Sequence, residues 1–417
     1  MIARVKAIVL SSTFLDTFYS LLGNAGVALG GMLFTIILAR NLSPAQFGIY
    51  SSLWALSVLA SSIGDMGLSS ALVNFVPKLP QNRNQYVGLT LYLQLGISLF
   101  LFLILVVLSP FSDQIIPGST PYLQFLAAAM TLIYILDNFG LSLLKAEKKF
   151  FLSSLIQTIE SGNKLLWLFL AAVLGMVSIP LAILVAVFAA IVTTIICLKN
   201  EFPQIRWFWP KVQLLEIFTF TKWIALMRVF SVAVARIDIL ILGKMAGSYE
   251  AGIFAAGSRL AILFTLVVSS LSAVVAPRFS SHNSKKQLIS YIQKTTVLIS
   301  LIAAGMLFSA LLARPIILLV FGEKYLEAVP VFVALTFAMI PFLLSIITVN
   351  PLIYAFNQPA YVAWITVIQV VALVVLDIYL IPTFGALGPT ISLGITNTLV
   401  LVLTTIKLIQ QIRHAKI

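Results

Sequence analysis

The residues most able to do chemistry are charged side chains inside long apolar segments. The segment Lys222–Gly243 has about the length that crosses a bilayer, roughly 20 residues, yet its interior contains Arg228, Arg236 and Asp238. Arg259 enters the next apolar segment at a similar depth. A charge at membrane depth costs on the order of a few kcal/mol or more, so such groups face protein or a water-filled cavity. Three guanidinium groups there predict a site for an anion. The alternative is that each arginine forms a structural salt bridge or extends to an interface.

A second group of polar side chains follows one face of an apolar segment further upstream. Its spacing of 4, 3, 4 and 3 residues places five side chains on the same side of a helix. The five are Ser153, Gln157, Glu160, Lys164 and Trp167. Glu160 and Lys164 have the spacing of a helical ion pair, which by itself explains how they tolerate the membrane. Because the stripe extends beyond the pair, Lys164, Glu160 and Gln157 are also candidates to line a cavity.

Acidic residues in other apolar segments are candidates for coupling transport to an ion. Asp65 belongs to a series of polar residues that recurs every four positions, namely Ser57, Ser61, Asp65 and Ser69. Asp65, Glu160 and Asp238 are groups that titrate or bind a cation if such coupling exists. Asp137 and Asp377 lie near the ends of their segments, where contact with the membrane interface is expected.

Composition places all of this chemistry in a membrane protein. Of the 417 residues, 61% are hydrophobic and only 9% are charged, and the mean hydropathy is +1.09. A soluble core does not need so much apolar sequence. The net charge of +13 is not read as nucleic-acid binding, because much of it lies in short loops between apolar segments. The single Cys197 and the two histidines, His282 and His414, predict no metal site, and no cofactor is expected.

Hydropathy predicts an all-α polytopic protein with about twelve transmembrane helices. The predicted spans are Thr17–Ala39, Gly48–Val76, Tyr86–Leu108, Tyr122–Leu144, Leu152–Leu174, Val177–Leu198, Lys222–Leu242, Ala251–Ala276, Tyr291–Leu312, Glu327–Val349, Tyr361–Ile381 and Gly385–Leu408. We therefore expect a six-helix lobe over residues 1–198, a cytoplasmic interlobe loop over 199–221 and a second six-helix lobe over 222–417. The aromatic residues Trp207, Phe208 and Trp209 of the loop fit a membrane interface.

The distribution of lysine and arginine predicts the orientation. With the N-terminus inside, 18 basic residues lie on the cytoplasmic side and 4 on the opposite side. This bias places both termini in the cytoplasm and suits the inner (plasma) membrane. The N-terminal MIARVKAIVL has no small-residue cleavage site after it, so we expect a retained lead-in and not a signal peptide.

The two halves resemble each other. Residues 39–56 align without gaps on residues 243–260, which places Arg40 on Lys244 and Gly48 on Gly252. Each half has an even number of predicted spans, so the repeats share one orientation. Transporters of this construction bind substrate between their halves and expose it alternately to each side.

Several blocks resemble the polysaccharide-biosynthesis and O-antigen-type flippases of the multidrug/oligosaccharidyl-lipid/polysaccharide (MOP) superfamily. The block A-R-x-L-x-P-x-x-F-G-x-Y covers Ala39–Tyr50, and similar blocks cover Gly247–Ala256 and Phe321–Ala328. The resemblance implies a MATE-like bundle of two pseudo-symmetric lobes. It also implies a flippase that moves a polyprenyl-diphosphate-linked oligosaccharide from the cytoplasmic to the outer leaflet. Polysaccharide-assembly enzymes are possible partners, and a monomer is expected.

Two other functions remain open. An ion-coupled multidrug exporter of the same superfamily binds organic cations, which favours buried carboxylates, whereas the intramembrane bases here are at least as numerous as the acids. A membrane glycosyltransferase or polysaccharide polymerase needs acids near a large external loop, and the predicted external loops are short. The protein is therefore expected to be a transporter and not an enzyme.

Overall fold

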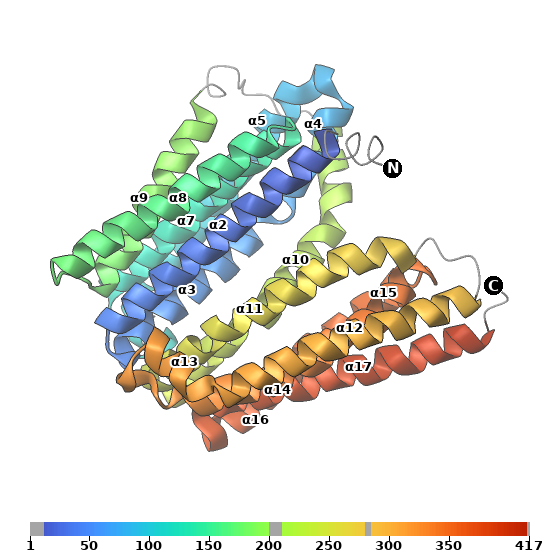
Figure 1. Cartoon of the computed structure of the whole chain (residues 1–417). Coiled ribbons are helices and arrows are strands. Elements are labelled where there is room, and N and C mark those ends of the chain that lie inside the picture. Colours follow the sequence, from blue (N-terminus) through green and yellow to red (C-terminus); the bar gives the residue numbers. More distant parts are fainter. Residues whose placement is uncertain (1–11, 200–210, 280–284, 415–417) are drawn as a thin grey trace. The chain divides into compact units, whose positions relative to one another are not determined.

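The computed structural model describes residues 12–199, 211–279 and 285–414, and within these ranges the chain is helical with short turns and no strand (Figure 1). The all-α fold class is confirmed. The predicted N-terminal lead-in, the aromatic residues Trp207–Trp209 and His282 lie outside the described residues.

The helices of the first half follow the predicted spans closely. They are α2 (Ser12–Asn41), α3 (Pro44–Asp65), α4 (Leu68–Lys78), α5 (Arg83–Val107), α6 (Ser112–Ile115), α7 (Pro121–Ala146), α8 (Phe150–Val173) and α9 (Ile179–Leu198). Local chemistry sets some of these bounds. The hydroxyls of Thr120 and Ser178 accept hydrogen bonds from the backbone N–H groups of Leu123 and Leu181, and a proline follows each cap within two residues.

The second half repeats this order. Its helices are α10 (Lys211–Ala246), α11 (Ser248–Phe279), α12 (Lys285–Leu311), α13 (Ala313–Val320), α14 (Ala328–Leu344), α15 (Ile346–Tyr354), α16 (Pro359–Phe384) and α17 (Gly388–His414), with short 3-10 turns η4 (Glu323–Tyr325) and η5 (Gly385–Leu387). Residues 39–56 and 243–260, which align in the sequence, are 204 positions apart, and so are Gly118 and Gly322. Both of these glycines have a positive φ, of 81° and 89°. The repeat seen in the sequence therefore extends to the backbone of the loops before α7 and α14.

Eight helical segments in the described ranges are long and apolar enough to cross a membrane, and one of them, Pro359–Arg413, contains both α16 and α17. The protein is polytopic, as predicted. The count of twelve spans is compatible with these helices and stays a prediction.

Three predicted spans differ from the observed helices. The second span is interrupted, because Met66 and Gly67 adopt positive φ values of 43° and 74° between α3 and α4. The tenth is divided at Ser345 into α14 and α15. The seventh begins at Lys211 and not at Lys222, so the predicted loop over 199–221 is wrong from Lys211 onward.

The early start of α10 has a packing reason. Leu214, Ile217 and Phe220 recur every three residues and pack on a core formed by α4, α5 and α7, where Ile217 is fully buried. In that core the rings of Phe75 and Tyr86 are stacked with centroids 5.0 Å apart, and the Tyr86 hydroxyl donates a hydrogen bond to Glu216. Polar residues lie between these apolar side chains, so hydropathy alone does not mark this part of α10 as a membrane span.

The chain forms two compact units whose boundaries do not coincide with the predicted lobes. Unit 1 comprises Met1–Leu42 and Leu53–Val232, and unit 2 comprises Ser43–Ser52 and Ala233–Ile417. In unit 1, α2 packs on α8, as Figure 1 shows, and α7 packs on α5 and α9. In unit 2, α17 packs on α14 and α16, and α14 packs on α11. Helices α3 and α10 thus each contribute to both units.

A reciprocal glycine contact joins the starts of α3 and α11 within unit 2. A Cβ atom added to Gly48 would lie 1.8 Å from the carbonyl oxygen of Ser248, and one added to Gly252 would lie 1.8 Å from the carbonyl oxygen of Pro44. Both pairs are related by the offset of 204 residues that relates the repeats. The equivalent glycines therefore allow two equivalent backbones to touch, as in helix contacts of membrane proteins built on small residues.

We predict that Gly252→Ala destabilises the protein by about 1–3 kcal/mol, because its methyl group would force the α3 and α11 backbones apart. The matched control is Gly305→Ala in α12, where an added Cβ meets no atom within 4 Å. There the better helix propensity of alanine makes the change neutral or stabilising. Thermal unfolding in detergent, followed by tryptophan fluorescence, measures both. Equal stability of the two variants would contradict the reciprocal contact.

Candidate functional site

Asp65 and Arg228 form an ion pair inside unit 1. Nη1 of Arg228 lies 2.6 Å from Oδ2 of Asp65, whose side chain is 1% exposed, whereas the Arg228 side chain is 35% exposed. The other carboxylate oxygen, Oδ1, accepts hydrogen bonds from Nε2 of Gln94 at 2.8 Å and from the backbone N–H and hydroxyl of Ser69. Asp65 is therefore fully bonded at the point where α3 stops.

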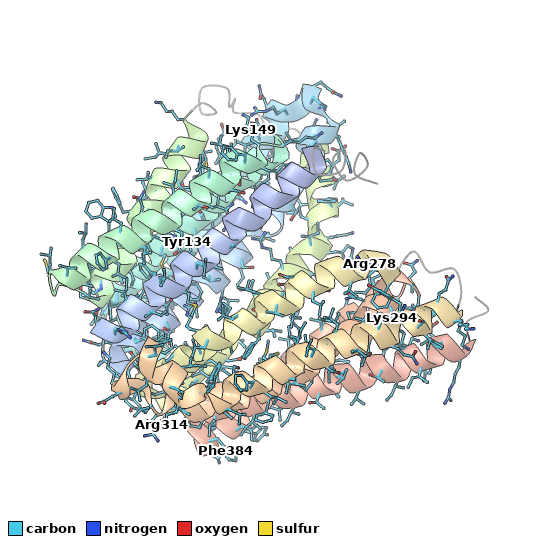
Figure 2. All side chains as sticks on the ribbon, viewed as in Figure 1. Tyr134, Lys149, Arg278, Lys294, Arg314 and Phe384 are labelled. Carbon is cyan, nitrogen blue, oxygen red and sulfur yellow. The ribbon has the colours of Figure 1, made fainter. Side chains whose placement is uncertain are left out.

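Lys164 and Glu160 form the predicted ion pair on α8. The Lys164 ammonium contacts the Glu160 carboxylate and lies 5.6 Å from the centre of the Tyr134 ring, on α7. Figure 2 marks Tyr134 among the helices of unit 1. Asp137, one turn after Tyr134, is close enough to interact electrostatically with both charges. This group of charges and an aromatic ring is inside unit 1, and its net charge is negative by one when all three groups are ionised.

The remaining members of the α8 stripe are less uniform. Gln157 is half-buried and donates to the hydroxyl of Ser153 at 3.2 Å. Trp167 is 48% exposed. The neighbouring face of α8 is covered by α2, where Gly23, Gly26 and Gly30 stand against Ser154, Thr158 and Ser161. The stripe is thus a buried ion pair with polar neighbours, and Lys164, Glu160 and Gln157 remain proposed cavity residues.

Unit 2 holds the other predicted basic residues. Arg236 on α10 and Arg259 on α11 are both half-buried, and their charges repel each other. Asp238, two residues further along α10, attracts Arg236. Arg236, Arg259 and Asp238 thus form a local group of two cations and one acid in unit 2. The other predicted basic site residues, Arg228 and Lys164, belong to unit 1.

The sequence did not identify Asp377 as part of this group. Its carboxyl group, on α16, is fully buried and interacts with that of Asp238. Oδ1 of Asp238 and both carboxyl oxygens of Asp377 have no hydrogen bond of good geometry. The expectation of an interface position is wrong for Asp377, and also for Asp137, which is 9% exposed. The predicted span ends at Ile381, whereas α16 continues to Phe384, so Asp377 lies further from the end of the helix than expected.

Basic residues lie toward both ends of unit 2. Figure 2 shows Arg278 and Lys294 toward one end of this unit and Arg314 and Phe384 toward the other. Arg278 and Lys294 belong to predicted cytoplasmic segments and Arg314 to a predicted external one. The absolute orientation stays a prediction.

Comparisons with known proteins place this geometry in a family. A family model described as "Polysaccharide biosynthesis protein" matches residues 37–330. The chain belongs to this family. A putative O-antigen transporter of Shigella flexneri is 23% identical over 381 residues, which cover 86% of this chain and 88% of the relative.

Solved structures share the fold of the chain. The lipid II flippase MurJ, in an inward closed conformation, has a TM-score of 0.72 and 18% identity, with 95% of this chain and 89% of MurJ covered. An inward-facing MATE multidrug transporter of the MOP superfamily has a TM-score of 0.72 and 15% identity, with 94% and 98% covered. The MATE-like fold expected from the sequence is confirmed.

We predict that Glu160→Gln lowers the stability of unit 1 by about 1–3 kcal/mol, because it leaves the Lys164 ammonium without its charged partner. The double variant Glu160→Gln/Lys164→Met should recover most of the loss, since it removes both charges and keeps the side-chain volume. Thermal unfolding in detergent compares the two. A double variant less stable than the single one would show that Lys164 has another essential partner.

Proposed function

We infer that this protein is a flippase that carries a lipid-linked oligosaccharide across the membrane for the assembly of a cell-surface polysaccharide. Membership of the polysaccharide biosynthesis family and the fold shared with a lipid II flippase support this function. The O-antigen transporter relative supports a surface polysaccharide as the destination. The O-antigen transporter, the lipid II flippase and the multidrug transporter described above are named for transport, which supports a protein that is not an enzyme.

The observation that carries the substrate class is Arg228 of unit 1, whose side chain is 35% exposed although its guanidinium is paired with the buried Asp65. A lipid-linked sugar can leave its apolar tail in the bilayer, but its diphosphate loses water when it crosses. Arginine replaces that water with bidentate hydrogen bonds to phosphate oxygens. We propose that Arg228, Arg236, Arg259 and Lys164 contact the diphosphate of a polyprenyl-diphosphate-linked oligosaccharide.

The cellular setting follows from this role. We propose that the protein lies in the inner (plasma) membrane with both termini in the cytoplasm, because most of the loop lysines and arginines lie on the side of the termini. Polysaccharide-assembly enzymes are its proposed partners. The six-plus-six repeat is sufficient for a monomer to enclose its own polar groups.

The ion-coupled exporter is the second candidate, and one observation gives it weight. Asp238 and Asp377 bury two carboxyl groups side by side, close enough for their negative charges to repel each other. Such a pair is stabilised by a shared proton or a bound cation. The same pair would serve a flippase whose cycle is driven by an ion, so we propose it as the coupling site in either case.

Flipping in reconstituted vesicles tests the function. A labelled polyprenyl-diphosphate oligosaccharide should cross in the presence of the intact protein, and Arg228→Ala or Arg259→Ala should reduce the rate at least tenfold because a phosphate contact is lost. Lys164→Ala should also reduce it. Lys222→Ala removes an exposed charge from the same helix as Arg228 and should leave the rate unchanged. Transport of an organic cation in place of the lipid-linked sugar would establish the exporter instead.

Ion dependence tests the coupling site. In the same vesicles, an imposed Na⁺ or H⁺ gradient should accelerate flipping by the intact protein, and Asp377→Asn should abolish that acceleration because the second carboxylate is lost. Glu323→Gln, an exposed change in η4, is the control and should respond like the intact protein. A rate that responds to the gradient equally in Asp377→Asn would show that coupling lies elsewhere.

A further inference from the structure

The middle of α10 packs against the break between α3 and α4. Met66 and Gly67 leave the helical conformation, and an added Cβ on Gly67 would lie 3.3 Å from the backbone nitrogen of Ala225 and 3.2 Å from Cγ2 of Ile224. The backbone of α10 therefore lies close to the break. One turn further along α10, Arg228 reaches Asp65, the last residue of α3. The contact and the ion pair together hold α10 on the break, and all of these residues belong to unit 1.

The two oxygens of Asp65 depend on different parts of unit 1. Oδ1 is bonded by Gln94 of α5 and by Ser69 of α4, whereas Oδ2 is bonded by Arg228. If Arg228 moved away, Asp65 would keep the donors of Gln94 and Ser69. These hydrogen bonds to Oδ1 do not depend on α10, so they lower the free-energy cost of separating Asp65 from Arg228.

Arg228 keeps capacity for another anion. A guanidinium has five N–H donors, and its hydrogen bond to Asp65 uses Nη1. About a third of its side chain is exposed, whereas Asp65 is buried. Lys145, at the end of α7, is close enough for its charge to repel that of Arg228. An anion bound at Arg228 would therefore lie near a second cation, Lys145, which adds to its attraction.

We propose that Asp65 is an exchangeable partner of Arg228, which the diphosphate of the incoming lipid-linked sugar displaces. Without substrate, the ion pair keeps α10 on the α3–α4 break. With substrate, Arg228 bonds the diphosphate, which offers more charge and bidentate geometry, and α10 leaves the break. Arg228 is neutralised in both states, so no step leaves a bare guanidinium in the membrane. This inference rests on the proposed function and adds to it how substrate binding changes the conformation.

Competition between two anions for one cation has a measurable consequence. Asp65 lowers the affinity for the diphosphate, because part of the binding free energy is used to separate Asp65 from Arg228. Removal of the Asp65 charge should therefore tighten binding. A purely structural ion pair predicts the reverse, since its loss would disorder the site.

The first experiment measures binding of farnesyl diphosphate to the full-length protein in detergent by calorimetry. Asp65→Asn should bind about tenfold more tightly than the intact protein and Arg228→Ala at least tenfold more weakly. The double variant should match Arg228→Ala, because Asp65 acts only through Arg228. Glu323→Gln removes one exposed negative charge and should bind like the intact protein. Unchanged or weaker binding by a folded Asp65→Asn variant would overturn the exchange.

If Asp65→Asn does not fold, a second variant, Arg228→Lys, tests the proposed exchange. Arg228→Lys keeps an ion pair with Asp65 but lacks the planar fork that suits a diphosphate. It should unfold near the temperature of the intact protein and bind farnesyl diphosphate several-fold more weakly. Equal affinity would show that Arg228 only stabilises the fold and would overturn the proposal.

The second experiment measures the movement of α10. Spin labels are attached at Val73→Cys of α4 and Leu226→Cys of α10, both exposed positions, in a protein whose buried Cys197 is changed to serine. Farnesyl diphosphate should lengthen the distance between the labels, and Asp65→Asn should show the longer distance without ligand. An unchanged distance in a protein that still flips lipid-linked sugar would overturn the exchange and leave the proposed function intact. If lipid-linked sugar does not cross at all, the proposed function fails first.

Discussion

The structure depends on the rule that a charge inside a bilayer needs a partner at every stage. The described helices follow this rule in three ways. Asp65 is bonded on both oxygens, Lys164 is held by Glu160 and lies close to an aromatic ring, and Arg236 lies close to Asp238. Each arrangement uses residues from inside one compact unit. A helical unit can therefore change its surroundings during transport without exposing an unpaired charge to lipid.

Small residues allow these polar groups to meet. Glycines of α2 let the hydroxyl-bearing face of α8 approach, and Gly48 and Gly252 let the starts of α3 and α11 touch. Lipid tails are as apolar as leucine, so association of the helices relies on close contact more than on the exclusion of water. The positions of glycine and serine thus determine which charged helices become neighbours.

The sequence predicted the fold class, most of the helix bounds and the ion pair of Glu160 with Lys164. These features depend on local composition and on periodicity, which a single sequence contains. It did not predict the interruption at Met66–Gly67, the amphipathic start of α10 or the pairing of Asp377 with Asp238. Each of these depends on what a distant segment places against the residue. The sequence also does not reveal the partner of Arg228: it marks Asp65 only as a candidate coupling residue, and no spacing connects positions 65 and 228.

The exchange of segments between the two units has a consequence for biogenesis. Residues 43–52 of α3 pack with unit 2, whose other residues begin only at Ala233, and residues 211–232 of α10 complete unit 1. The ribosome therefore delivers the beginning of α3 long before its packing partners exist, while unit 1 stays incomplete until the chain has passed the midpoint. Insertion of each helix can follow synthesis in order, but maturation of either unit must wait for the second repeat. Two halves expressed separately with a cut in residues 199–210 would each lack a segment that the other holds.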